Sequence, residues 1–99
     1  MIALDFTFTA KLWRWKGGSW HFVTLPQDVS ADIKAFGSDT RRGFGSVRVD
    51  VRSGDEAWAT SLFPSKENAA YLLPVKASIR DALGVAAGDE LNLTVTLDP

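Results

Sequence analysis

The side chains best suited to contacting another molecule are four large aromatic residues around a Gly-Gly pair at positions 17 and 18. They are Trp13, Trp15, Trp20 and Phe22. Aromatic rings held on a protein surface provide large, rigid contact areas for a protein or a small ligand. Alternatively, a bulge could rotate the strand and pack these rings inward, as core or second-layer residues. Both roles stay open from the sequence, and packing is the simpler one.

Arginine side chains could hold an anion or a nucleic-acid phosphate through charge-assisted hydrogen bonds. The segment 37–45, GSDTRRGFG, combines three glycines with Arg41 and Arg42. Its spacing matches neither a phosphate-binding loop nor a dinucleotide-binding fingerprint. A solvated connecting loop is therefore the simpler interpretation of this segment.

A further arginine, Arg80, follows Ile79 on a short predicted helix, and Lys34 holds the corresponding place in an earlier helix. We expect Arg80 to pair with Asp81 or Asp89, or to bind carbonyl oxygens at the helix end. Contact with an anion or a nucleic acid is the alternative role for this side chain.

Residues that could carry out catalysis are few. His21 is the only histidine, and we expect it on a strand surface opposite Arg14. Ser61 lacks the surrounding motif of a nucleophilic serine. The adjacent carboxylates of 55–56 and 89–90 fall in predicted turns, whereas acid–base chemistry needs two carboxylates held on facing elements.

With no cysteine and no calcium-loop spacing, the sequence predicts neither a metal site nor a cofactor.

The composition is that of one small domain spanning residues 1–99. Hydrophobic residues make up 45% of the chain, which is enough for a single core. The net charge of −1 argues against a protein that binds nucleic acid through a basic surplus. The first ten residues alternate in polarity, unlike a signal peptide, and no apolar run could span a membrane. We therefore expect a cytoplasmic protein without membrane contact.

Alternating hydrophobic and polar residues predict β-strands over most of the chain. The predicted strands are residues 4–15, 20–25, 46–52, 57–63, 71–74 and 90–97. A two-residue loop at Gly17-Gly18 sets the first register: Leu12 opposite Val23, Trp13 opposite Phe22 and Trp15 opposite Trp20. A turn at Gly54-Asp55 sets the second: Val47 opposite Leu62, Val49 opposite Thr60 and Val51 opposite Trp58.

Two short helices are predicted at residues 27–36 and 76–83, with Gly37 and Gly84 as C-terminal stops. Pro64 is expected to end the fourth strand. The helical residues expected to face the sheet are Val29, Ile33 and Phe36 in the first helix and Ile79 and Leu83 in the second.

The two halves of the chain, approximately 4–52 and 57–98, repeat one layout. Leu25-Pro26 precedes the pattern Val-x-Ala-x-Ile-Lys, and Leu73-Pro74 precedes Val-x-Ala-x-Ile-Arg. A glycine and an alternating strand follow in both halves. A strand–helix–strand unit that cannot bury its apolar face alone is expected to interlock with its copy. The repeat therefore predicts a mainly β fold: a β-barrel with pseudo-two-fold symmetry and two short helices at its ends.

Nearly the whole chain resembles the small bacterial and archaeal family catalogued as domain of unknown function 1905. The motifs that carry this resemblance are Trp20-x-Phe22-Val23-x-Leu25-Pro26, Ser61-Leu62-Phe63-Pro64, Tyr71-x-Leu73-Pro74-x-Lys76, Ile79-Arg80, Gly84 and Gly88-Asp89. The resemblance implies a double-split β-barrel made from one chain, and it implies no established activity.

Residues 73–95 are also similar to the swapped-hairpin DNA-binding domains of the AbrB and MazE type, with their proline, Ile-Arg, Leu-Gly and Gly-Asp landmarks. Those proteins build such a barrel from two short chains and bind DNA through basic residues. Here one chain would supply both halves, although its first half lacks the Gly-Asp turn.

Three classes of function follow from these observations. The leading hypothesis is a non-enzymatic binding module that recognises a protein or a small ligand, as a monomer or weak dimer, through the aromatic cluster or a cleft beside the helices. The second is a degenerate nucleic-acid binder, although the net charge makes nucleic acid the less favoured partner. Its candidate contacts are Arg14, Arg41, Arg42, Arg48 and Arg52. The third is a small enzyme with a site at the barrel mouth.

Overall fold

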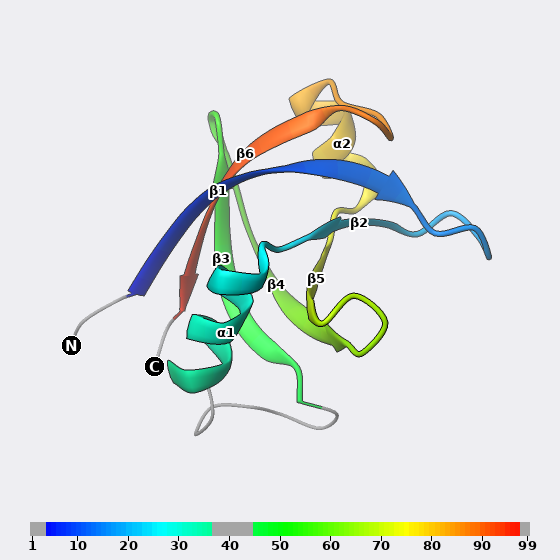
Figure 1. Cartoon of the computed structure of the whole chain (residues 1–99). Helices are drawn as coiled ribbons and strands as arrows, with labels where there is room; N and C mark the ends of the chain where they lie inside the picture. Colours follow the sequence, from blue (N-terminus) through cyan, green and yellow to red (C-terminus); the bar gives the residue numbers. More distant parts are fainter. Residues whose placement is uncertain (1–3, 37–44, 98–99) are drawn as a thin grey trace.

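The computed structural model describes residues 4–36 and 45–97, which form six strands and two short helices (Figure 1). The elements are β1 (Leu4–Arg14), β2 (His21–Thr24), α1 (Gln27–Phe36), β3 (Val47–Ser53), β4 (Glu56–Ser65), β5 (Ala70–Pro74), α2 (Ala77–Leu83) and β6 (Glu90–Leu97). All strand pairs are antiparallel, and the strands close into a barrel in the order β1-β2-β5-β4-β3-β6. This confirms the predicted β-barrel with two short helices. Within the described ranges, neither helix is long and apolar enough to cross a membrane.

The strand pairing has two-fold symmetry. If β1, β2 and β3 are exchanged with β4, β5 and β6, the pair β1–β2 becomes β4–β5 and β1–β6 becomes β3–β4. The pairs β2–β5 and β3–β6 map onto themselves. In the described residues β3 pairs only with strands of the second half, and β6 only with strands of the first. The two halves therefore interlock, as the repeat predicts.

Each long strand changes its partner along its length. Residues 4–11 of β1 pair with β6, and residues 12–14 pair with β2. Residues 56–62 of β4 pair with β3, and residues 63–65 pair with β5. Because the neighbouring strands diverge at these points, the barrel has two splits, as a double-split architecture requires. Among the described residues, each stretch of these long strands therefore has a strand on one side only, and the longer stretches with a free side are residues 4–11 of β1 and 56–62 of β4.

Both predicted registers are confirmed. The observed pairs include Leu12–Val23, Trp13–Phe22, Val47–Leu62, Val49–Thr60 and Val51–Trp58. The first ladder ends at Arg14 and His21, with one further backbone hydrogen bond from Trp15 N to Trp20 O at 2.8 Å. Residues 16–19 therefore form a longer loop than the two-residue loop expected, in the same register.

The core is formed by the inward side of each strand and one isoleucine from each helix. On β3, Val47, Val49 and Val51 are buried, whereas the residues between them are exposed. The two helices lie at opposite ends of the barrel (Figure 1). Ile33 of α1 and Ile79 of α2 belong to the same core cluster. Burying a Val, Leu or Ile side chain contributes about 1.5–3 kcal/mol. A one-residue slip would expose a whole strand face, so this register is strongly favoured.

Some local predictions were wrong. Phe36 is 60% exposed, because Ser30 and Ile33 face the barrel and Phe36 lies at the far end of α1. Strand β4 continues through Pro64 to Ser65; it has only β5 as a neighbour there, and proline is tolerated on such an edge. Helix α2 begins at Ala77, one residue later than expected. The predicted stop at Gly37 lies outside the described residues.

The C-terminal end of α2 matches its predicted cap. Gly84 adopts the left-handed conformation with φ 68°, which glycine reaches without a steric penalty. The backbone N–H of Val85 then donates to the carbonyl oxygen of Arg80 at 3.0 Å. This closure directs the chain through the turn at Gly88 into β6.

A buried hydrogen bond joins α1 to β5. Ser30 is only 5% exposed, and its Oγ accepts a hydrogen bond from the backbone N–H of Tyr71 at 3.1 Å. Without this hydroxyl, the N–H of Tyr71 would lose its partner in a buried position.

Ser30→Ala should therefore destabilise the protein by about 1–3 kcal/mol, the cost of leaving a buried donor unsatisfied. Ser78→Ala is the matched control, because Ser78 is exposed on the other helix and its loss should change stability by less than about 0.5 kcal/mol. Urea denaturation of both variants measures the difference. Equal stability of the two would contradict the role assigned to Ser30.

Candidate functional site

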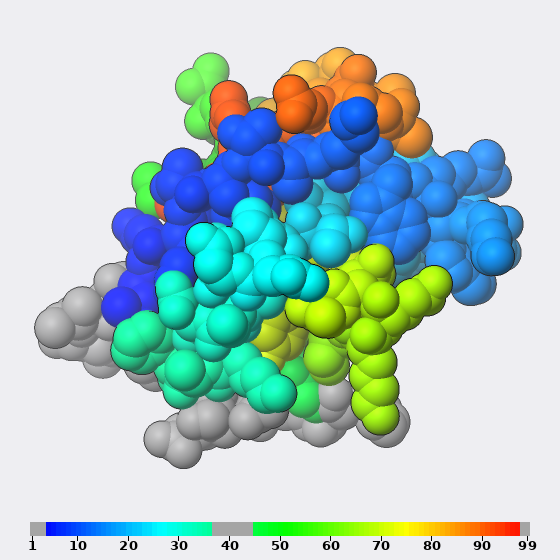
Figure 2. Space-filling view, viewed as in Figure 1, coloured from blue at the N-terminus to red at the C-terminus, as the bar shows by residue number. Residues whose placement is uncertain are grey.

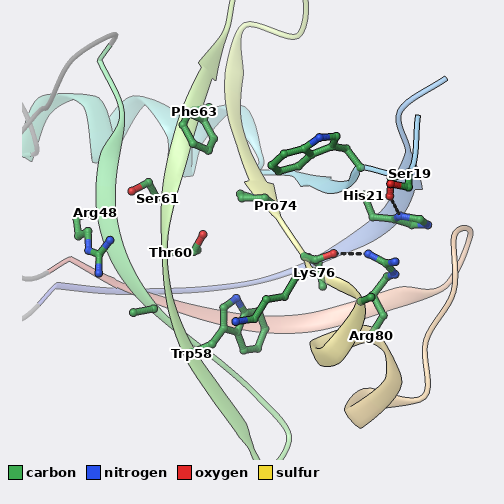
Figure 3. Close-up of a pocket in the computed structure, with 14 residues that line it drawn as sticks. Ser19, His21, Arg48, Trp58, Thr60, Ser61, Phe63, Pro74, Lys76 and Arg80 are labelled. Atoms are coloured by element: carbon green, nitrogen blue, oxygen red, sulfur yellow. Dashed lines mark hydrogen bonds between the residues drawn. The ribbon is translucent and has the colours of Figure 1, made fainter. Parts of the chain in front are cut away.

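A groove opens beside α2, at the split where β4 separates from β5 (Figure 3). Its volume is about 580 Å³, a size typical of ligand sites. The lining comes from four parts of the chain: residues 19–21 of the β1–β2 hairpin, Arg48 of β3, residues 58–61 and 63 of β4, and residues 74–77 and 80. The groove is therefore a product of the barrel topology and joins elements far apart in sequence.

Three positively charged side chains line this groove. Arg48 comes from β3, Lys76 from the connection between β5 and α2, and Arg80 from α2. Neither aspartate nor glutamate is among the lining residues in the described part of the chain. Arginine and lysine only donate hydrogen bonds, so this lining favours a ligand rich in acceptors or negative charge. We call it the cationic groove.

Aromatic residues form the apolar part of the same groove. Trp20 and Phe63 are 58% and 44% exposed, and Trp58 lies half-buried on β4. The Nε1 atom of Trp58 is buried and has no hydrogen-bond acceptor among the described residues. Figure 3 shows Lys76 extending toward Trp58, with Arg48 on the other side of β4. The groove thus combines flat ring surfaces with a set of donors.

Arg80 is held by a backbone carbonyl and not by a carboxylate. Its Nη1 donates to the carbonyl oxygen of Val75 at 2.6 Å (Figure 3). Within the described residues no ion pair joins it to Asp81 or Asp89, and Asp89 Oδ2 instead accepts a hydrogen bond from Ala86 N at 2.9 Å. Of the two alternatives expected for Arg80, the ion pair is not formed; a backbone carbonyl holds the guanidinium, but it belongs to Val75, which precedes α2, and not to the C-terminal end of the helix. The guanidinium retains further donors beside the groove.

His21 lies opposite Arg14, as expected, and it is half-buried and lines the groove. Its Nδ1 is 2.8 Å from the carbonyl oxygen of Ser19. Because a carbonyl can only accept, Nδ1 carries the hydrogen in this contact. The contact fixes the orientation of the ring at the mouth of the groove.

The aromatic cluster lies on the outer face of the β1–β2 hairpin, and the continuous register excludes the bulge that would have turned it inward. The rings of Trp20 and Phe22 are stacked with centroids 5.9 Å apart, and those of Trp13 and Phe22 are 5.2 Å apart and tilted. Trp13 Nε1 also donates to Thr24 Oγ1 at 2.9 Å. Three of the four rings therefore support one another, and the outermost, Trp20, reaches the groove.

The fourth ring, that of Trp15, packs against the hairpin loop. Trp15 is 47% exposed, and a Cβ placed on Gly17 would lie only 2.4 Å from its Cη2. The ring can lie over the loop because residue 17 has no side chain. Figures 1 and 2 show this part of the hairpin projecting from the body of the barrel.

A family model described as Domain of unknown function (DUF1905) matches residues 8–95. The chain belongs to the DUF1905 family. The matched range contains every residue that lines the cationic groove. A comparison with curated proteins finds no significant match.

The arginines proposed for nucleic-acid binding have different surroundings in this DUF1905 chain. Arg48 lines the groove, and Arg14 Nε donates to the carbonyl oxygen of Gly18 at 2.8 Å. Arg52 lies 3.8 Å from Asp5 in an exposed ion pair. The predicted contacts Arg41 and Arg42 lie outside the described residues.

A second groove, of about 480 Å³, lies beside α1. Lys34 lines it and corresponds by the sequence repeat to Arg80, and Lys66 is the other cation in its described lining. No residue of β1 is among those lining residues, so this groove does not follow the β1 split. Of the two splits in the DUF1905 barrel, the described residues place a groove along that of β4.

Most of the groove residues have no distinguishing sequence signal. Trp58 and Thr60 belong to the inward-facing set of β4, and Lys76 follows a strand end. From the sequence, Trp20, Arg80 and, as a nucleic-acid contact, Arg48 are the lining residues proposed to bind a partner, and His21 and Ser61 are considered only for catalysis. The motif containing Pro74 and Lys76 marks one wall, but the opposite wall comes from β4 and becomes adjacent only in the folded DUF1905 domain.

Gly17→Ala should displace the indole of Trp15, since the added Cβ would overlap the ring. Gly18→Ala is the matched control, because its Cβ would lie 3.6 Å from the same ring, an ordinary contact. The Trp15 indole N–H resonance should move in the first variant and stay in place in the second. Stability should fall by less than about 1 kcal/mol, because an exposed ring can turn away. An unmoved resonance in Gly17→Ala would show that the ring does not lie over the loop.

Proposed function

We propose that this DUF1905 domain is a binding module that takes a negatively charged partner with a flat apolar group into the cationic groove. The observation that supports the proposal is the composition of the lining: Arg48, Lys76 and Arg80, with no carboxylate among the described lining residues. An ion of opposite charge placed among these side chains gains charge-assisted hydrogen bonds.

The aromatic residues support the apolar part of this ligand. Trp20 and Phe63 leave ring surface exposed at the groove, where a planar group can stack. The buried N–H of Trp58 adds a donor that lacks an acceptor among the described residues. An unsatisfied buried donor costs about 1–3 kcal/mol, so a ligand that supplies an acceptor there would bind more tightly.

We propose binding without catalysis, because the described lining does not supply a pair of acid–base groups. Its hydroxyl residues are Ser19, Thr60 and Ser61, and its one imidazole, that of His21, is held by a backbone carbonyl and not by a carboxylate. A nucleophilic mechanism would need a hydroxyl and a base within hydrogen-bond reach, with the base oriented by a third group.

The probe that tests the proposal is 2-naphthyl phosphate, which combines a planar ring with an anion. Arg48→Gln and Lys76→Gln should each weaken its binding by roughly two- to fivefold, the effect of losing one exposed ion pair. Lys11→Gln is the matched control, because Lys11 is an exposed cation on β1 outside the groove. Binding is measured by titration of the tryptophan fluorescence and of ¹⁵N chemical shifts.

Binding should also weaken as salt rises, because exposed charges are screened. Equal affinity for uncharged 2-naphthol would contradict the role of the cations. Shifts confined to residues outside the groove would contradict the site. A duplex DNA titration at low salt in the same series shows whether nucleic acid competes for these side chains.

A further inference from the structure

The cationic groove runs along an unpaired edge of strand β4. Residues 56–62 of β4 pair with β3 on one side, and β5 pairs with β4 only over residues 63–65. Residues 58–61, which precede this short contact, line the groove consecutively. Among the described residues, no backbone hydrogen bond from a helix or loop reaches this stretch. Its outward backbone N–H and C=O groups are therefore available to another extended chain.

We infer that the partner of the groove is an acidic, extended segment of another protein, which adds to β4 as a further strand. This inference rests on the proposed function and names the class of ligand. Strand addition supplies main-chain hydrogen bonds along the edge, and the side chains beside it supply the specificity. At roughly 3.3 Å per residue, the edge formed by residues 58–61 accommodates about four residues of the partner.

The cations are placed to meet side chains on both faces of an added strand. On the outer face of β4, Ala59 and Ser61 are small, and Arg48 is the neighbour of Ser61 on β3. On the other face, which carries Trp58 and Thr60, Lys76 extends toward Trp58, and Arg80 lies farther along the groove on α2 (Figure 3). Successive side chains of a strand point to opposite faces, so an acidic residue of the partner would meet a cation on whichever face its side chain lies. An aromatic residue of the partner could contact Trp20 or Phe63 at the groove wall.

The same charges disfavour pairing between two copies of this edge. A symmetric pair brings the same surface of both molecules together. Arg48, Lys76 and Arg80 of one molecule would then face the same cations of the other, with no carboxylate in the described groove to compensate. Charged side chains beside an edge strand are a common protection against self-association. An acidic partner instead turns this repulsion into attraction.

The test uses an acetylated, amidated hexapeptide of four glutamates, one valine and one phenylalanine. Two further versions carry N-methyl groups on alternate residues: one on the odd-numbered residues of the peptide and the other on the even-numbered residues. Their charge and sequence are unchanged. Successive amides of an added strand point alternately toward β4 and away from it. We expect one methylated version to bind as well as the parent and the other to lose about tenfold or more, because its donors to β4 are blocked.

Hydrogen exchange provides a second measurement on the unmodified domain. The parent peptide should slow the exchange of edge amides within residues 58–61 and leave the buried amides of β3 unchanged. A peptide with lysine in place of glutamate is the charge control and should not bind. Sedimentation of the free domain should show no dimer at the concentration used; a dimer that slows the same amides would overturn the inference in favour of self-pairing.

The remaining outcomes separate the inference from the proposed function. If both methylated peptides bind like the parent and the Lys76→Gln substitution still lowers their affinity, the anion site stands and strand addition is overturned. If 2-naphthyl phosphate binds and the peptide does not, the ligand is a small molecule and the inference fails alone. If neither binds, both the inference and the proposed function fail.

Discussion

The pairing of β3 with β6, and of each with the long strand of the opposite half, is the contact on which the rest of the barrel depends. Within one half, β3 has no partner strand among the described residues, and neither has β6. A separated half would leave Val47, Val49 and Val51 exposed and the backbone groups of β3 unpaired. The two repeated halves therefore stabilise each other.

Closing the barrel in this way creates the two splits. Strand β4 must leave β3 and join β5 to complete the ring, and the change of partner uncovers part of its edge. Helix α2 covers the barrel near this point through Ile79, whereas Lys76 and Arg80 remain at the side of the groove. The same topology that buries the core thus leaves backbone and cationic side chains together on one surface.

Charge is distributed unevenly over a nearly neutral chain. Several carboxylates serve local structure: Asp5 pairs with Arg52, Asp28 accepts a hydrogen bond from Val29 N, and Asp89 accepts one from Ala86 N. The described groove lining has three cations and none of these acids. A net charge of −1 therefore gives no indication of the local field, which decides which ligands can approach.

The sequence by itself determined the strands, their registers and the barrel class, because these depend on local patterns. Alternation with period two assigns the inward face of β3, and glycine-containing turns set the pairs Trp13–Phe22 and Val51–Trp58. Tertiary structure alone decided which residues meet at the groove. Arg48, Trp58 and Lys76 come from separate elements, and no local pattern encodes their distance from one another. Likewise, Phe36 has helical spacing but lies beyond the barrel, because burial depends on where the neighbouring element ends.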